Sequence, residues 1–562
     1  MTYDLKITGG TIVDGTGRPG EVGDVGIRDG GLVALGSAPG AATSEIDARG
    51  KVVAPGFVDI HTHYDAQILW DRMLSISPWH GVTTVVVGNC GFGIAPTRRE
   101  HRGLVLQTLE KVEGMSLAAL EEGLGDAWEF ETFPEYLDAI ERRGMAINVG
   151  VLLGHTPLRL HALGEEASER PASVDEIERM RVAVREALEA GALGFATSKS
   201  ATHIGYAGRP VPSRLAEFEE IRRLASALGE AGKGILQATF GRDLFLEQFA
   251  VIARETGRPI TWTALLGGML GPNGHRGVLE QTAKLVADGL QIVPQVTGRP
   301  LNFEFDLREP FLFESLAVFR PVSAADFEGK KQIYRDAAFR SAFREKAGGT
   351  ASGTLAGRWG RTAISYCPQR PDLEGRSVAT VAAQSGIDPV DLVLDLSLDS
   401  DLQARFRMAV LNFDEAEVSE LLSDQNTVLG LSDAGAHASQ LCDACFATHL
   451  LEHWVREKGV LRLEEAVRML TSRPADLFGI TDRGRLVVGN PADVVVFDPD
   501  TVGAGPLRRA HDLPAGSDRL VSDAYGIDAV VVNGVVVRSR GADEIDPSGR
   551  LPGRLLRHGR GS

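Results

Sequence analysis

Short apolar runs alternate with charged, helix-like segments through the middle of the chain. Charged amphipathic segments at 174–190, 215–231 and 244–256 separate several of these runs, and glycine follows each soon after its end, as it does at helix ends. A repeated strand–helix pattern of this kind predicts an α/β fold, a TIM (β/α)8 barrel whose chemistry lies at the carboxyl ends of its strands. The eight expected strands are 56–60, 83–87, 147–153, 193–197, 234–237, 260–263, 291–295 and 428–432.

Both ends of the chain have the alternating pattern and turn signals of β-structure. Residues 4–8 and 24–28 alternate near the start, and the β-branched run 529–537 surrounds Asn533–Gly534, a strong hairpin signal. Neither end holds enough strands for an independent sandwich. We therefore predict a composite β-sandwich domain from 1–54 plus 485–545, a barrel over 55–484, and a solvated tail at 546–562.

A long segment separates the seventh and eighth expected strands. It runs over roughly 130 residues, far beyond a normal loop, and contains helical patterns at 323–346 and 389–399. We predict that 299–427 forms a lid or subdomain inserted between strands seven and eight of the barrel.

Composition narrows the class of protein. The 562 residues include 59 basic and 76 acidic side chains, a net charge of −17, which argues against a nucleic-acid or anionic-membrane partner. Four cysteines exclude a disulfide scaffold, and no run of about 18 apolar residues suggests a membrane span. The start of the chain lacks the pattern of a signal peptide. We expect a soluble, cytoplasmic protein.

Two histidines follow the first expected barrel strand at a spacing typical of metal binding. His61 and His63 stand at positions i and i+2, so their side chains project to the same side of an extended segment. At the end of a strand both imidazoles can hold one divalent metal ion. Asp59 and Asp65 flank the pair and are candidates for orienting the rings.

A cysteine and an aspartate end two further strands. Cys90 follows the apolar run 83–87, where its thiolate is a soft ligand for zinc; a buried, inert cysteine is the alternative. Asp433 follows the last expected strand, where a carboxylate can bind metal and accept a proton from water; a helix N-cap is the alternative there. We interpret both residues as part of one metal site with His61 and His63.

The segments that carry these residues resemble the amidohydrolase superfamily. PGFVDIHTH at 55–63, GVTTVVVGNCG at 81–91 and LSDAGAH at 431–437 are most similar to its N-acyl-D-amino-acid deacylase (D-aminoacylase) branch, and 484–497 is similar to its closing strands. The resemblance implies a barrel with one or two Zn2+ ions, or another divalent metal, and hydrolysis of an amide or related C–N bond. It also implies His61, His63, Cys90 and Asp433 as the metal and catalytic residues.

The chain departs from that family at two strands. The family pattern has a ligand histidine at the end of strands five and six, where this chain has Gln237 and then Trp262 or Thr263. Leu265 and Leu266 replace the family's basic residue linked to carboxylate recognition. A mononuclear site and a site with replacement ligands both remain open.

Several residues near the expected catalytic rim are candidates for the missing functions. Gln237, His155, His203 and Lys199 are candidate replacement ligands, the last one in a carboxylated form. His155 is a candidate for polarising the substrate carbonyl. We expect substrate contacts from Arg299, Trp262, Lys199 and His203, with backbone-bonded loop or surface positions as the alternatives.

These observations lead to a functional hypothesis. We predict a metal-dependent amidohydrolase that deacylates N-acyl-amino acids or related small amides through metal-activated water, with Asp433 as general base and acid. Hydrolysis of a cyclic amide, carbamate or formamide is one alternative, and a non-hydrolytic barrel with a binding or assembly role is another. The expected partner is a small-molecule amide, and the chain is expected to form a homo-oligomer.

Overall fold

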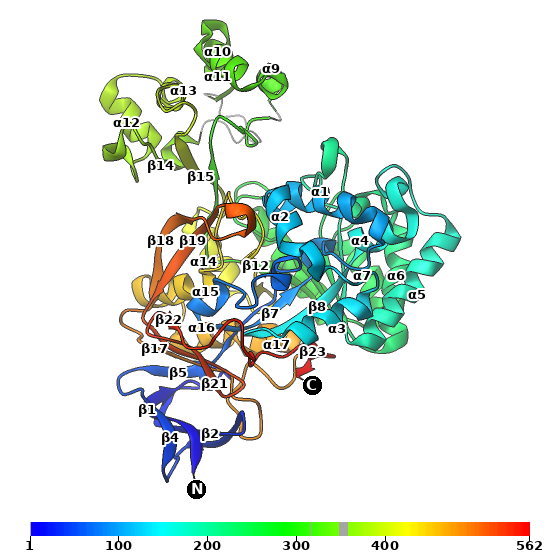
Figure 1. Ribbon diagram of the computed structural model, residues 1–562, viewed down its shortest axis with the longest axis vertical. Helices are drawn as coiled ribbons and strands as arrows, with labels where there is room; N and C mark the ends of the chain where they lie inside the picture. Colours follow the sequence, from blue (N-terminus) through cyan, green and yellow to red (C-terminus); the bar gives the residue numbers. More distant parts are fainter. Residues whose placement is uncertain (1, 315, 348–357, 562) are drawn as a thin grey trace.

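An eight-stranded parallel sheet forms the centre of the molecule in a computed structural model, which describes residues 2–314, 316–347 and 358–561. Its strands lie side by side in chain order, which confirms the predicted barrel (Figure 1). The strands are β6 (Phe57–Asp59), β7 (Val82–Val87), β8 (Asn148–Gly154), β9 (Gly194–Ser198), β10 (Ile235–Thr239), β11 (Ile260–Thr263), β12 (Ile292–Val296) and β16 (Val428–Leu429).

Helices cover the outside of this sheet. Six of the eight barrel strands are buried along their whole length, as expected for a parallel sheet with both faces covered. Local signals set the helix boundaries: Ser173 and Glu176 form a capping box at the start of α5, and Gly191 ends it with a positive φ. The helices are α1 (Arg102–Glu113), α2 (Leu117–Leu124), α3 (Phe133–Arg143), α4 (His155–Leu163), α5 (Val174–Ala190), α6 (Phe218–Ala231), α7 (Leu246–Thr256), α8 (Gly274–Ala287), α14 (Glu415–Ser423), α15 (Phe446–His449), α16 (Leu463–Leu470) and α17 (Ser472–Leu477).

The barrel closes between its first strand and the segment after its last one. Thr62 and Ala434 form a parallel bridge, and the amide of His63 donates to the carbonyl of Ala434 over 2.7 Å. The amide of Asp433 in turn donates to the carbonyl of His61 over 3.1 Å. The ends of the first and eighth strands are therefore held together where both carry candidate catalytic residues.

The two ends of the chain build one β domain, as predicted from sequence. It is a continuous nine-stranded sheet in which β5 from the first part of the chain pairs antiparallel with β17 from the last part. A separate hairpin, β18 (Gly503–Ala510) and β19 (Arg519–Tyr525), lies beside the barrel. The sheet contains β1 (Tyr3–Ile12), β2 (Glu21–Arg28), β3 (Gly31–Gly36), β4 (Ala42–Asp47), β5 (Val52–Pro55), β17 (Val494–Phe497), β20 (Ile527–Val532), β21 (Val535–Ser539) and β22 (Ala542–Asp543).

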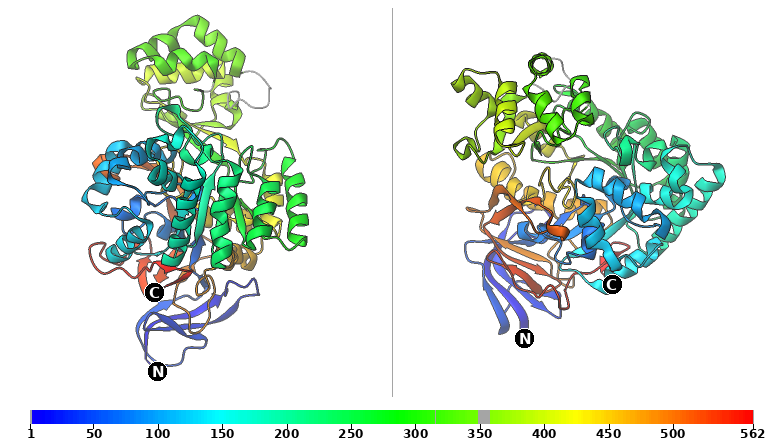
Figure 2. Two further views of the ribbon diagram at one scale, coloured as in Figure 1. Left: turned by 90° about the vertical axis from the view of Figure 1, so that its right-hand side faces the viewer. Right: turned by 45° about the horizontal axis from the view of Figure 1, so that its top comes forward.

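The insertion, residues 301–411, stands at the carboxyl-terminal side of the barrel strands and extends away from the barrel (Figures 1 and 2). It has its own core, in which Phe313, Phe319 and Phe343 pack together with ring centroids 4.8 to 5.3 Å apart. Its elements are β13 (Leu301–Phe305), α9 (Arg320–Ala324), α10 (Phe327–Arg335), α11 (Ala337–Ala347), β14 (Thr362–Tyr366), α12 (Val378–Ser385), α13 (Pro389–Asp399) and β15 (Arg405–Leu411).

The C-terminal segment is not a solvated tail, which corrects the sequence prediction. Leu551, Leu555 and Leu556 are buried, and Leu555 bridges to Val149 of β8 in the barrel. Two short strands, β23 (Leu556–Arg557) and β24 (Arg560–Gly561), follow. The prediction was wrong because it relied on the many charged residues of this segment and overlooked its three leucines, which are buried. No helix in the described part of the chain is long and apolar enough to cross a membrane.

Removing one of these anchors should destabilise the protein. Leu555 is 2% exposed, so Leu555→Ala is expected to lower the free energy of unfolding by about 2–5 kcal/mol through lost burial and a cavity. Urea denaturation followed by circular dichroism measures this change. Leu270→Ala is the control, because Leu270 is 46% exposed and its truncation should have little effect. Equal stability of both variants would contradict the docking of this segment.

Candidate metal centre

Three predicted ligands meet at the carboxyl ends of the first two barrel strands. One ligand atom each from His61, His63 and Cys90 lies within 4.8 Å of the others, and all three residues are buried. The His61 and His63 rings are tilted, with centroids 5.4 Å apart. Two imidazole nitrogens and one thiolate are characteristic donors for zinc.

A glutamine on strand seven orients the His61 ring. His61 Nδ1 lies 2.7 Å from Gln295 Oε1, an oxygen that can only accept, so Nδ1 carries the proton. Nε2 is then the ring nitrogen left for a metal, and it faces Cys90 Sγ at 3.4 Å. A fixed tautomer of this kind is the usual arrangement of a metal-binding histidine.

Cys90 is held in an unusual backbone conformation by a second glutamine. Its φ is 55°, in the left-handed region, and its amide donates to Gln237 Oε1 over 2.7 Å. Burial alone would raise the pKa of the Cys90 thiol, but His61 and His63 lower it to about 6. The thiolate form needed for metal binding is therefore favoured at neutral pH.

A carboxylate from helix α1 approaches the other histidine. Glu113 Oε1 lies 3.3 Å from His63 Nδ1, and both side chains are less than a tenth exposed. Burial lowers the pKa of His63, but Glu113 and Cys90 outweigh this effect and raise it well above its usual value. Metal binding at His63 would therefore release a proton.

Asp433 lies on the open side of this cluster. Its Oδ1 is 3.3 Å from His61 Nε2 and 3.8 Å from His63 Nε2, and its side chain is 21% exposed. Its φ of 45° turns the backbone sharply after β16 and directs the carboxylate towards the histidines. The arrangement places a proton acceptor beside the candidate metal ligands with access to solvent.

A glutamine on strand β10 supports the three clustered candidate ligands. Gln237 stands where the family pattern has a histidine, and its Oε1 accepts a hydrogen bond from the Cys90 amide. Its Nε2 is buried without a hydrogen-bond partner among the described residues, and an amide nitrogen is not a metal donor. Gln237 therefore supports the Cys90 backbone, and its role as a replacement ligand stays a prediction.

Trp262 points away from the site, contrary to its predicted substrate contact. It is fully buried and packs against Phe240, Phe245 and Phe249 outside the sheet. Side chains alternate along a strand, so the neighbours of Trp262 face inward: Thr261 bonds to Gln295 and Thr263 to Thr239. Neither threonine supplies the imidazole of the family pattern.

His155 is a structural residue, which corrects its predicted catalytic role. Its Nδ1 lies 2.8 Å from Thr197 Oγ1 and its Nε2 lies 2.9 Å from Glu220 Oε1, so neither ring nitrogen is available to substrate. Arg159 bonds to the same carboxylate. Burial raises the pKa of Glu220, but His155 and Arg159 lower it overall, so the group is a charged, buried triad.

Lys199 and Arg299 are also engaged elsewhere. Lys199 Nζ donates to the carbonyls of Arg214 and Ala216, each over 2.7 Å, which places it away from a bridging position between metals. Arg299 Nε donates to Asp443 Oδ1 over 2.7 Å in a nearly buried ion pair. The structure thus offers neither residue as a free ligand or free carboxylate contact.

Two further histidines border the site. His203 packs against Phe92 with tilted rings whose centroids are 5.0 Å apart, and Phe92 contacts His63 in turn. His437 meets Phe303 of the insertion edge to face at 5.8 Å. Burial lowers the pKa of His203 to about 3 and also lowers that of His437, so both rings are neutral at neutral pH.

Sequence reasoning missed Gln295, Glu113 and His437 as members of the site. Gln295 could have been recognised, because it lies near the end of strand seven at a position whose side chain points into the barrel. No feature of the sequence pointed to Glu113, because it is the last residue of helix α1 and lies outside the three motifs. His437 was visible within the third motif but had no assigned role.

Loss of the Gln295 acceptor should weaken metal binding. Gln295→Leu keeps the volume but leaves His61 Nδ1 without its partner, and we expect metal affinity to fall by about 10–100-fold. Chelator competition followed by metal analysis measures this affinity. Gln291→Leu, directly before the start of the same strand, is the matched control. Unchanged affinity in Gln295→Leu would refute the orienting role.

The buried triad predicts a stability effect without a direct effect on the metal. Glu220→Ala leaves Arg159 charged and unpaired in the interior, so we expect a loss of about 3–5 kcal/mol in the free energy of unfolding. Glu219→Ala is the control on the same helix, since its ion pair with Arg222 is exposed and worth about 0–1 kcal/mol. Urea titrations that gave both variants the same stability would contradict this assignment.

Comparison with known proteins gives consistent matches along the whole chain. A model of the amidohydrolase family matches residues 44–538. D-aminoacylase of Alcaligenes xylosoxydans xylosoxydans is 30% identical over 564 residues, covering 98% of each chain. The crystal structure of N-acyl-D-glutamate deacylase from Bordetella bronchiseptica, with zinc and a phosphonate mimic of the tetrahedral intermediate, has 28% identity and a TM-score of 0.66, and covers 99% of this chain and 100% of that one. A D-aminoacylase structure that concerns a binuclear metal centre has 27% identity and a TM-score of 0.65, with 98% and 100% coverage.

Proposed function

The chain belongs to the amidohydrolase family, and from this premise we propose that it is a metal-dependent deacylase of N-acyl-D-amino acids. The observation that carries the proposal is the convergence of His61, His63 and Cys90 beside Asp433 at the carboxyl end of the barrel. Relatives of about 30% identity include deacylases of N-acyl-D-glutamate and N-acyl-D-aspartate, which supports the class of substrate without selecting its side chain.

His61, His63 and Cys90 would hold the metal ion, with Asp433 at its open side. A bound zinc ion would lower the pKa of water and polarise the substrate carbonyl. The two glutamines do not touch the reacting atoms in this proposal. Gln295 fixes the His61 tautomer, and Gln237 fixes the Cys90 backbone, so both act as positioning residues.

Asp433 performs the proton transfers. Its carboxylate takes a proton from the water that attacks the acyl carbon, and returns that proton to the amine nitrogen as the C–N bond breaks. The 3.3 and 3.8 Å separations from the two histidines hold the carboxylate beside the reacting centre. Its partial exposure is consistent with a group that must meet both water and the leaving amine.

His203 and His437 are proposed to bind the substrate. Both rings are neutral, so each has one N–H donor and one acceptor, and His203 already uses Nδ1 towards Ser198 over 2.7 Å. The remaining nitrogen of His203 is suited to a carbonyl or carboxylate oxygen. Phe303 beside His437 brings the insertion into contact with this side of the site.

A substrate panel tests the proposed function. Zinc-loaded protein is assayed for amine release from N-acetyl-D-amino acids, from their L-enantiomers and from the corresponding D-amino-acid amides that lack the carboxylate. We expect turnover of D-substrates, slower turnover of L-substrates, and loss of activity in Asp433→Asn. If no N-acyl-D-amino acid is hydrolysed by protein with stoichiometric metal, the proposal fails.

We also propose a cytoplasmic location and a homo-oligomeric state. All four cysteines are unpaired and buried, as is usual in a reducing compartment. Light scattering of the purified protein checks the assembly state, and localisation of a tagged chain checks the compartment.

A further inference from the structure

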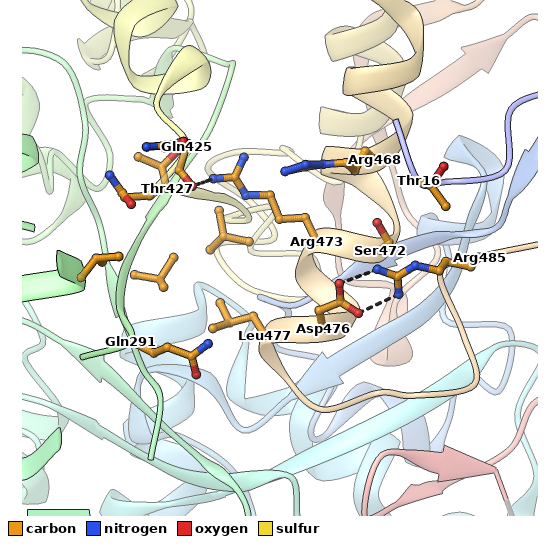
Figure 3. A pocket seen from close by; sticks show the side chains of 14 residues that line it. Thr16, Gln291, Gln425, Thr427, Arg468, Ser472, Arg473, Asp476, Leu477 and Arg485 are labelled. Atoms are coloured by element: carbon orange, nitrogen blue, oxygen red, sulfur yellow. Dashed lines mark hydrogen bonds and ion pairs between the residues drawn. The ribbon is translucent and has the colours of Figure 1, made fainter. Parts of the chain in front are cut away.

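A cavity of about 470 Å³ opens at the amino-terminal end of the barrel, opposite the metal centre (Figure 3). Its walls come from the beginnings of strands β12 and β16, from helices α16 and α17, and from loops of the β domain. Its volume lies within the range of small-molecule sites. The lining residues central to the argument are Arg468, Arg473, Arg485, Asp476, Val293 and Leu477.

Arg473 carries a charge that no carboxylate neutralises directly. Its guanidinium donates to the backbone carbonyls of Asp424 and Gln425, and no hydrogen bond or ion pair joins it to a carboxylate among the described residues. Burial and the positive charge of Arg468 lower the pKa of Arg473, an effect that Glu465 and Asp424 only partly offset. The surroundings therefore favour an additional negative charge beside this guanidinium.

Arg468 is the second cation of this wall. Its Nε forms an ion pair with Glu465 at 3.6 Å, but this buried nitrogen has no hydrogen-bond partner among the described residues. Figure 3 shows the Arg468 and Arg473 side chains along the same upper side of the cavity. Two guanidinium groups thus repel each other at one wall, as they do in sites that bind anions.

The third arginine provides an internal contrast. Arg485 binds Asp476 through two parallel hydrogen bonds of 2.7 and 2.6 Å, drawn as dashed lines in Figure 3. The opposite charges of this bidentate pair compensate each other. The lining also includes the apolar side chains of Val286, Val293 and Leu477. The cavity therefore offers a cationic wall, a neutral ion pair and an apolar surface.

We propose that this cavity binds the phosphate group of a small molecule between Arg468 and Arg473. Guanidinium groups match the geometry of phosphate oxygens, and a phosphate has enough oxygens to accept from both arginines at once. The apolar side chains of the lining suit the organic part of a phosphate monoester. This site is separate from the metal centre and does not depend on the deacylase activity proposed above.

Titration calorimetry of the full, metal-loaded protein tests the proposal with inorganic phosphate and phenyl phosphate as probes. We expect both to bind, and Arg468→Gln to weaken this binding by about tenfold, as expected for the loss of one charged hydrogen bond. Phosphate that binds to the metal centre should bind equally to Arg468→Gln. The heat of this binding is therefore fitted as a separate site in both proteins. Tighter binding of phenyl phosphate assigns the site to esters, and equal binding assigns it to free phosphate.

Arg222→Gln is the matched control, because it removes the same charge from an exposed ion pair on helix α6. Phosphate affinity equal to that of the wild type in Arg468→Gln, or equal losses in both variants, overturns the proposal. Arg473→Gln is a second variant, and its thermal unfolding is measured because its backbone contacts are structural. A crystal of the wild type soaked with tungstate should show anomalous density between Arg468 and Arg473, and absence of this density also overturns the proposal.

Discussion

Asp433→Asn is expected to lower kcat by about 10²–10⁴-fold, the usual range for loss of a positioned acid–base group. The amide keeps the size of the side chain and the hydrogen bond from the Asp433 backbone to His61, but it cannot accept and return the proton. Turnover of the best N-acetyl-D-amino acid gives kcat and KM, and metal analysis of the same sample gives the metal content.

The separate changes in kcat, KM and metal content identify the role of the Asp433 carboxylate. We expect kcat to fall while KM changes little and metal remains bound, because His61, His63 and Cys90 still provide three ligands. Asp47→Asn is the control, since Asp47 pairs with Arg49 on the surface of the β domain. A variant that keeps wild-type kcat, or that loses activity only by losing its metal, would exclude Asp433 as the proton-transfer group.

Local patterns predicted the parts of the site that lie on strand ends. His61, His63, Cys90 and Asp433 follow apolar runs, and parallel strands in a barrel bring their carboxyl ends to one face. The architecture therefore followed from periodicity, and the neighbourhood of the four residues followed from the architecture. The same logic applies to Gln295, whose inward parity could have been noticed.

The remaining features depend on long-range packing that no local pattern encodes. Trp262 lies within an apolar strand just as Gln237 does, but it is one residue out of phase and faces the helices. The role of His155 was hidden because its partner, Glu220, lies on a helix 65 residues later. The C-terminal segment is charged, but it is anchored by the buried residues Leu551, Leu555 and Leu556. Three leucines in such a segment form no periodic pattern that would predict their burial. In each case the partner, not the residue itself, determines the role.

The departures from the family pattern acquire a physical explanation in this structure. Gln237 and Gln295 each use an amide oxygen to accept from a backbone or ring N–H next to a ligand. Two positions of the barrel interior thus contact candidate ligands of the metal site proposed above. Cys90 is the anionic donor among the three clustered candidates His61, His63 and Cys90.

Cys90→Ala is therefore expected to reduce metal affinity by more than about 100-fold, beyond the range typical of losing an outer partner. The change removes the thiolate, and the two histidines that remain provide only neutral nitrogen donors. Competition against a chromophoric chelator measures the affinity, and activity is assayed at saturating zinc. Thermal unfolding is recorded as well, since alanine must adopt the same φ of 55°.

Cys367→Ala is the matched control, because Cys367 is buried in the core of the insertion and far from the barrel face that carries the ligands. Both variants lose a buried thiol, so both are expected to lose some stability, but only Cys90→Ala should lose metal. Cys90→Ser separates donor chemistry from volume, since a hydroxyl is a harder and weaker ligand than a thiolate. Metal affinity that is equal in Cys90→Ala and the wild type would mean that Asp433 and the histidines hold the ion without the thiolate, and that Gln237 positions a backbone turn instead of a ligand.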